Sequence, residues 1–254
     1  MINLEGRVAL VTGAGRGIGR ATALALSERG ARVMCVSRTE KELKRLSREA
    51  GLDYIVETVA TDEGCARIVD ETRERLGPID ILINNAGVGS HRDKPIWATT
   101  NEVWEESIAT NLNGPFYLTR RVIKEMRSRR WGRIVMVAST ASEVAYPRMV
   151  SYAASKHGVL GLVRAVAQDV APYNVTCNAV MPGWVRTKMA EKHAQADARR
   201  AGVPIASIYE SWDAESPAGR IVAPEEVANT IAFLVSDEAS GINGDAITIA
   251  LGGT

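Results

Sequence analysis

Short apolar runs alternate with amphipathic stretches along most of the chain. The runs predict β-strands at Val8–Thr12, Arg32–Ser37, Asp53–Thr58, Asp80–Asn84, Arg133–Ser139, Val175–Val180 and Ala246–Ala250. The amphipathic stretches predict helices at Gly17–Arg29, Glu40–Ala50, Glu63–Leu76, Asn101–Arg129, Val150–Ala171 and Pro224–Val235. Strands that are apolar throughout are covered on both faces, so this order predicts an α/β fold with a doubly wound parallel sheet. We expect one domain over residues 1–254, because no linker, repeat or low-complexity tract divides the chain.

One charged segment, from Lys188 to Arg220, interrupts the alternation. It follows Pro182-Gly183, which ends a predicted strand, and its only aromatic residues apart from histidine are Tyr209 and Trp212. Long excursions from a compact domain are often lids, so we predict a lid or substrate loop over about residues 188–220. A solvated surface insertion is the alternative.

The composition excludes several classes of partner. The formal charge is +1, from 31 basic and 30 acidic residues, which argues against nucleic acid and anionic membranes as partners. No stretch approaches the roughly 20 apolar residues of a transmembrane helix, and the N-terminus lacks the pattern of a signal peptide. Cys35, Cys65 and Cys177 are odd in number and lack metal-ligand spacing. We therefore expect free thiols, no metal site and a cytoplasmic protein.

A glycine-rich turn follows the first predicted strand and opens the first predicted helix, in Thr12-Gly13-Ala14-Gly15-Arg16-Gly17-Ile18-Gly19. Free backbone N–H groups and the helix dipole at such a junction attract a phosphate, and glycine lets the pyrophosphate approach. The turn therefore predicts a Rossmann-type nucleotide site, although glycine-rich turns also occur as simple connections.

A second group of residues can exchange a proton with a carbonyl oxygen. Tyr152 and Lys156 are four residues apart, which places them on one helix face. The lysine cation is expected to lower the pKa of the phenol from its ordinary value of about 10. Ser139 ends a predicted buried strand and is the candidate to hydrogen-bond the same oxygen, with Ser142 and Ser151 as alternatives.

These pieces meet at one edge of the predicted sheet. The glycine turn, Asn84-Asn85-Ala86-Gly87, Ser139 and Pro182-Gly183 each follow a predicted strand. In doubly wound sheets, ligands bind beyond the carboxyl ends of the strands, where the strand order reverses. We therefore expect one site at this edge. Candidate substrate contacts are Ser90 to Trp97, Thr140 to Met149 and Trp184.

In order and spacing, the motifs resemble those of the short-chain dehydrogenase/reductase family, over essentially the whole chain, in its 3-oxoacyl carrier-protein reductase-like branch. The resemblance implies that Tyr152 is the general acid/base, that Lys156 assists it and binds the nicotinamide ribose, and that Ser139 holds the substrate oxygen. Asn111 would position a water linked to Lys156. The implied cofactor-binding residues are Gly13, Gly15, Arg16, Gly17, Ile18, Gly19, Ser37, Arg38, Ala60, Asn85, Ala86, Gly87, Tyr152, Lys156, Pro182, Gly183, Val185 and Thr187.

The end of the second predicted strand bears on the choice of cofactor. An acid there is typical of enzymes that prefer NAD, but this strand ends in Ser37 and is followed by Arg38. A guanidinium suits a phosphate dianion, and Arg16 in the glycine turn is placed to approach the same group. We therefore expect NADP(H), with NAD(H) as the alternative. The family often has an Asp after the third strand where this chain has Val59. Asp62 is expected to cap the next helix instead.

The resemblance implies NADPH-dependent reduction of a ketone to a secondary alcohol, which is reversible. The partner would be a small-molecule carbonyl or alcohol, and the family suggests a homo-oligomer, commonly a tetramer. The alternatives are an NAD-dependent dehydrogenase that oxidises a sugar, polyol or cyclic alcohol, a non-redox lyase or dehalogenase on the same fold, and a non-catalytic scaffold.

Overall fold

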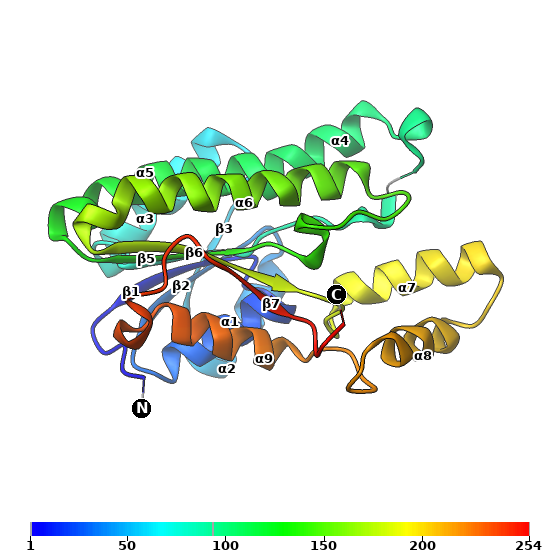
Figure 1. Ribbon diagram of the computed structural model, residues 1–254. Helices are drawn as coiled ribbons and strands as arrows, with labels where there is room; N and C mark the ends of the chain where they lie inside the picture. The colour runs from blue at the N-terminus through cyan, green and yellow to red at the C-terminus, as the bar shows by residue number, and fades with distance from the viewer. Residues whose placement is uncertain (1, 93, 254) are drawn as a thin grey trace.

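The computed structural model describes residues 2–92 and 94–253, and within them seven parallel strands form one sheet (Figure 1). The strand order is β3-β2-β1-β4-β5-β6-β7. The strands are β1 Val8–Thr12, β2 Arg32–Ser37, β3 Asp53–Val56, β4 Ile81–Asn84, β5 Gly132–Val137, β6 Val175–Pro182 and β7 Ala246–Ile249. This confirms the predicted doubly wound sheet, and the strand ends differ from the predicted ones by no more than two residues.

Helices cover both faces of the sheet (Figure 1). Above it in Figure 1 lie α3 Asp62–Leu76, α4 Asn101–Ile108, α5 Gly114–Arg129 and α6 Val150–Val170; below it lie α1 Gly17–Ser27, α2 Glu40–Ala50 and α9 Pro224–Leu234. Successive strand residues point to opposite faces. Val8 and Leu10 of β1 therefore join the core under α3, α5 and α6, whereas Ala9 and Val11 join the core over α1, α2 and α9.

The strand order reverses between β1 and β4. From β1 the chain passes outward through β2 and β3, then returns through α3 to β4 on the other side of β1. The connections that leave β1 and β4 therefore diverge at their carboxyl ends, and this opens a crevice between them.

The long helix predicted over Asn101–Arg129 is interrupted. Helix α4 ends at Ile108, a π-helical turn spans Ala109–Asn113, and α5 begins at Gly114. Pro115 has no N–H to continue the hydrogen-bond ladder. An added Cβ on Gly114 would lie 2.7 Å from the carbonyl oxygen of Val59, so the chain also packs closely here. π-helical turns are rare and are frequent at functional sites.

The charged segment after β6 is a helical hairpin, which the sequence pattern did not predict. Helix α7 spans Lys188–Ala201 and α8 spans Ile205–Glu215, and both project beyond the sheet at the right of Figure 1. The Thr187 side chain caps α7, and Gly202 ends it with a left-handed φ of 69°. Three alanines spaced four apart (Ala190, Ala194 and Ala198) form the buried stripe of α7. Small side chains carry this stripe, so its apolar periodicity is weak in the sequence.

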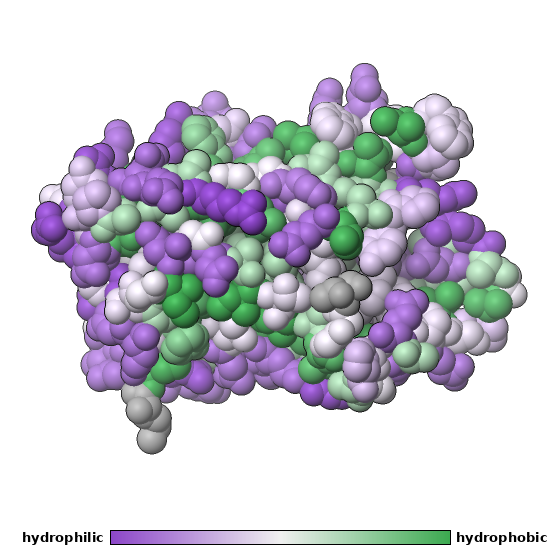
Figure 2. Space-filling view, in the orientation of Figure 1, coloured by the Kyte–Doolittle hydropathy of each residue, from purple (hydrophilic) through white to green (hydrophobic). Residues whose placement is uncertain are grey.

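Two smaller features complete the fold. Thr61, not Asp62, caps α3, because its side chain accepts a hydrogen bond from the Gly64 N–H, while Asp62 pairs with Arg120 and Arg121. Figure 2 shows polar side chains over most of the face in view, with hydrophobic side chains in separate groups. Within the described residues, no helix is long and apolar enough to cross a membrane.

Candidate active site

A cavity of about 760 Å³ runs along the carboxyl ends of the strands, from the glycine turn to the α7–α8 hairpin. Most of the predicted site residues line it: Gly13, Arg16, Gly17, Ile18, Ser37, Arg38, Asn85, Ala86, Gly87, Ser139, Tyr152, Lys156, Pro182, Gly183, Val185 and Thr187. Gly15, Gly19, Ala60 and Asn111 lie outside this lining. The structure thus brings the nucleotide motif and the proton-transfer group into one cavity.

Thr12 fixes the glycine turn against the segment after β4. Its hydroxyl accepts hydrogen bonds from the backbone N–H groups of Asn85 and Ala86, both at 3.0 Å. The Asn85 amide donates in return to the Thr12 carbonyl oxygen at 2.8 Å. Gly13, with φ +65°, lies so close that an added Cβ would be 2.7 Å from the Asn85 Nδ2. These contacts hold the glycine turn and the segment after β4 together at the crevice.

The N-terminus of α1 faces the cavity without a cap. Its N-cap residue Arg16 makes no side-chain cap hydrogen bond, and the first turn contains no acidic residue. Helices α3 and α7, by contrast, are capped by threonine side chains. Unpaired N–H groups at a helix start bind a phosphate well. This end of the cavity therefore fits the pyrophosphate of a dinucleotide.

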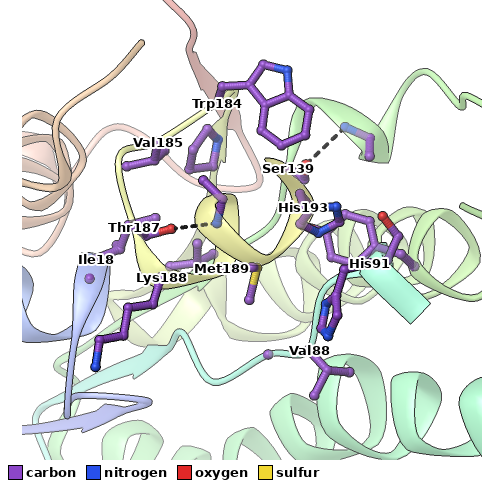
Figure 3. Close-up of a pocket in the computed structure, with 18 of the residues that line it drawn as sticks. Ile18, Val88, His91, Ser139, Trp184, Val185, Thr187, Lys188, Met189 and His193 are labelled. Carbon is purple, nitrogen blue, oxygen red and sulfur yellow. Dashed lines mark hydrogen bonds between the residues drawn. The ribbon is translucent and has the colours of Figure 1, made fainter. Parts of the chain in front are cut away.

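Ser139 and Tyr152 meet at the other end of the cavity. Ser139 follows β5 in extended conformation, and its Oγ accepts a hydrogen bond from the Ala141 N–H at 3.1 Å, which orients the hydroxyl (Figure 3). Desolvation raises the pKa of Tyr152 above its usual value, and a side-chain hydrogen bond with Ser139 acts in the opposite direction. The phenol is therefore a protonated acid at neutral pH.

Lys156 lies one helical turn from Tyr152 and is only 5% exposed. Its ammonium donates a hydrogen bond to the Val137 carbonyl oxygen at 2.6 Å and lies 5.7 Å from the centroid of the Tyr152 ring. Burial lowers the pKa of Lys156 to about 8. The expected lowering of the phenol pKa by this cation does not appear in the structure: desolvation raises the pKa of Tyr152, and the effect that opposes it is the hydrogen bond with Ser139.

Asn111 sits in the π-helical turn, behind the cavity wall. Its Oδ1 accepts from the Val88 N–H at 2.8 Å, and its Nδ2 donates to the Val88 carbonyl oxygen and the Ser155 Oγ, both at 3.0 Å. An added Cβ on Gly87 would lie 3.3 Å from the Asn111 Oδ1 and 3.9 Å from the Lys156 Nζ. Asn111 therefore joins the β4 loop to α6 beside the lysine.

The two alternative serines have structural partners. The Ser142 Oγ accepts from the Ser139 N–H at 3.3 Å, and the Ser151 Oγ is 3.1 Å from the Ser107 Oγ in the interior. Neither Ser142 nor Ser151 lines the cavity. Of these three serines, only Ser139 lines the cavity.

The histidines His91 and His193 also line the cavity, although no pattern in the sequence connects them. Figure 3 shows His91, from the segment after β4, and His193, from α7, beside each other; their ring centroids are 5.6 Å apart. Burial, with the neighbouring His91, lowers the pKa of His193 to about 4.

Trp184 stacks on Trp212 with 3.8 Å between ring centroids. An aromatic wall therefore bounds the substrate end. Of the predicted contacts after β4, Asp93 lies outside the described residues.

At the nucleotide end, both candidate phosphate-binding arginines have acidic neighbours. Arg16 pairs with Glu42 at 3.2 Å, and Arg38 lies 4.0 Å from Glu106. Val59 is buried and lines the cavity, so an apolar contact stands where the family often has an Asp. Glu42 was not among the predicted cofactor-binding residues, because it comes from α2 and not from the end of β2.

A doubly wound sheet with a nucleotide turn and a tyrosine–lysine pair in one cavity defines an NAD(P)-dependent oxidoreductase that acts on carbonyl or hydroxyl groups. A family model described as "Enoyl-(Acyl carrier protein) reductase" matches residues 13–254. The chain is 36% identical to the 3-oxoacyl-acyl-carrier-protein reductase FabG of Escherichia coli (strain K12), over 98% of this chain and 97% of that protein. The chain belongs to the short-chain dehydrogenase/reductase family, as its motifs indicated.

Two further relatives agree. An acetoacetyl-CoA reductase of Rhizobium meliloti (strain 1021) is 38% identical, over 95% of this chain and 96% of that protein. A solved actinorhodin polyketide ketoreductase with NADPH is 36% identical and superposes with a TM-score of 0.91, over 98% of both chains. Both relatives match nearly the whole chain, and the solved ketoreductase shares its fold.

Proposed function

We propose that the protein reduces a ketone to a secondary alcohol with NADPH, in a reversible reaction. The observation that carries the proposal is that one cavity joins the uncapped N-terminus of α1 to the Ser139–Tyr152 pair. The activities for which the relatives are named, reduction of 3-oxoacyl and acetoacetyl groups, support ketone reduction.

Each catalytic side chain has a distinct role in this proposal. Tyr152 donates its phenolic proton to the carbonyl oxygen, and the Ser139 hydroxyl hydrogen-bonds the same oxygen. The cofactor, when bound, supplies the hydride. Lys156 stabilises the phenolate that remains, and Asn111 positions a water that connects Lys156 to solvent. In the oxidation direction, the phenolate accepts the proton of the alcohol.

The nucleotide end supports NADP(H) over NAD(H). Arg16 and Arg38 both line the cavity there and would pair with a 2′-phosphate. Gly13, Gly15, Gly17, Ile18 and Gly19 would surround the pyrophosphate. Ser37, Ala60, Asn85, Ala86 and Gly87 would contact the adenosine half, and Pro182, Gly183, Val185 and Thr187 the nicotinamide half. The NADPH of the similar ketoreductase agrees with this preference.

The function is tested by screening 3-oxoacyl thioesters, cyclic ketones and the corresponding alcohols with NADPH and NADH, with absorbance at 340 nm as readout. We expect faster reduction with NADPH. Arg38→Asp should lower the NADPH-to-NADH ratio of kcat/KM by about 10–100-fold, the value of one charge-assisted hydrogen bond. Arg45→Asp, on α2 outside the cavity lining, is the matched control and should leave the ratio unchanged. Equal rates with both cofactors in the unmodified enzyme would overturn the preference.

We further infer a single cooperative domain with the α7–α8 hairpin as lid, a cytoplasmic location and a homotetramer. Three buried free thiols, on Cys35, Cys65 and Cys177, agree with a reducing compartment. Trp104 on α4 and Phe116 on α5 are 41% and 42% exposed, which suits contact between copies through these helices. Light scattering after size-exclusion chromatography tests the tetramer.

A further inference from the structure

Glu42 places a carboxylate in the nucleotide end of the cavity. It comes from α2, and its side chain is only 13% exposed. One oxygen, Oε1, accepts from the Arg16 guanidinium at 3.2 Å and from the Lys188 ammonium at 3.4 Å. These two cations come from the glycine turn and from the first residue of the lid helix α7. A single oxygen therefore connects α2, the turn and the lid.

The carboxylate lies against the glycine turn. An added Cβ on Gly15 would be 3.0 Å from both the Cβ and the Oε2 of Glu42, and 3.4 Å from the Ser37 Oγ. Ser37 ends β2, which is where the adenosine ribose of a dinucleotide lies in this class of fold. Arg16, Glu42 and Lys188 all line the cavity. Glu42 thus occupies the region proposed for the 2′-phosphate.

A carboxylate oxygen bridging two cations is the arrangement that a phosphate oxygen makes. Two unit negative charges about 4 Å apart repel by about 1–4 kcal/mol in surroundings between water and a protein surface. Glu42 and a 2′-phosphate therefore compete for the same two cations.

Resting on the NADP(H) preference above, we propose that Glu42 is an internal substitute for the cofactor phosphate. In the free enzyme it holds Arg16 and Lys188 together. A 2′-phosphate displaces it and takes both cations, so Lys188 becomes a further ligand of the phosphate, supplied by the lid. Glu42 lowers the affinity for phosphorylated nucleotides, and Lys188 couples the position of α7 to the kind of nucleotide bound.

The test uses nucleotide fragments without nicotinamide, so that binding is measured independently of turnover. Isothermal titration calorimetry compares 2′,5′-ADP with 5′-AMP. Glu42→Gln should bind 2′,5′-ADP about tenfold more tightly, equivalent to about 1.4 kcal/mol, with little change for 5′-AMP. Lys188→Gln should bind 2′,5′-ADP about tenfold more weakly, again with little change for 5′-AMP.

Glu40→Gln is the matched control. Glu40 lies on the same helix, pairs with Lys44 at 2.8 Å and lies outside the cavity lining, so both affinities should stay unchanged. Unchanged 2′,5′-ADP affinity in Glu42→Gln overturns the proposal. Weaker 5′-AMP binding in that variant also overturns it, because Glu42 would then hold a ribose hydroxyl.

A different result of the same titrations would overturn the preference for NADP(H). An unmodified enzyme that binds 5′-AMP but not 2′,5′-ADP overturns the preference for NADP(H). In that case, the role of Glu42 is still supported if Glu42→Gln binds 2′,5′-ADP. If that variant also fails to bind 2′,5′-ADP, the role of Glu42 is overturned as well. Circular dichroism of each variant verifies that the fold is retained.

Discussion

The ammonium of Lys156 donates a hydrogen bond to the carbonyl oxygen of Val137 at 2.6 Å. This contact joins helix α6 to the last residue of β5, two residues before Ser139. Tyr152 lies one turn before Lys156 on the same helix, so the contact also sets the phenol beside Ser139. The buried Lys156 therefore ties α6 to the end of β5.

The pH dependence of reduction should follow the ionisation of Lys156. Burial lowers the pKa of Lys156 to about 8, so the side chain is a cation below that pH and neutral above it. Only the cation stabilises the phenolate left after proton donation, so the rate should be constant on the acidic side and fall as pH rises past about 8. The parameter to measure is kcat/KM with NADPH varied, which reports ionisations of the free enzyme.

Lys156→Arg provides the check on that assignment. A guanidinium stays protonated throughout this range, so the variant should keep a reduced activity without the alkaline fall. A flat profile in the unmodified enzyme, or the same fall in the arginine variant, contradicts the assignment.

Tyr152→Phe removes the proton donor while keeping the ring. Reduction should slow by about 10²–10⁴-fold, the usual contribution of a general acid. Nucleotide affinity, measured by fluorescence titration, should be nearly unchanged. Tyr117→Phe, on α5 outside the cavity lining, is the control and should keep full activity. Retained activity in Tyr152→Phe would falsify the role of the phenol.

Much of this arrangement is predictable from local patterns. Strands β1, β4 and β6 are buried throughout and mostly apolar, so their positions and the parallel sheet follow from the sequence with small errors at the ends. The main site motifs come directly after these strands, so their meeting at one edge follows from the topology. Ser139 is an example, because its position at the sheet edge follows from the predicted end of β5.

What the sequence did not reveal depends on contacts between distant segments. Glu42 and Lys188 are 146 residues apart, and no local pattern pairs them. His91 and His193 meet only because α7 folds back over the segment after β4. The pKa of Tyr152 is a similar case, since helix spacing shows the nearby lysine but not the burial of the phenol.

Gly13 should tolerate alanine far less well than Gly51. Both have left-handed φ angles, +65° and +67°, so either substitution costs about 1–2 kcal/mol of folding free energy. At Gly51 no atom lies within 4 Å of an added Cβ, whereas at Gly13 the Asn85 Nδ2 would be 2.7 Å away. Gly13→Ala should therefore lose a further 1–3 kcal/mol or so from overpacking, and should also weaken nucleotide binding. Urea denaturation of both variants measures the difference, and equal losses contradict the close packing.

Trp212 should support substrate binding through the lid. It is 5% exposed, stacks on Trp184 and contacts Tyr209 edge to face, so it connects α8 to the end of β6. Trp212→Ala removes this contact and leaves a gap of a kind that costs about 3–5 kcal/mol in a protein core. The loss of stability is confined to the hairpin, so hydrogen exchange in residues 188–215 should become faster while the sheet stays protected.

The kinetic result should separate the lid from the catalytic group. In Trp212→Ala the KM for the ketone should rise, whereas kcat at saturating ketone and the affinity for 5′-AMP should change little, because Ser139, Tyr152 and the glycine turn lie outside the hairpin. Trp97→Ala is the control, since Trp97 is 86% exposed and outside the cavity lining. If Trp212→Ala lowers kcat as much as Tyr152→Phe while hydrogen exchange of the hairpin is unchanged, the hairpin is not a lid, and Trp212 acts on the reacting groups directly.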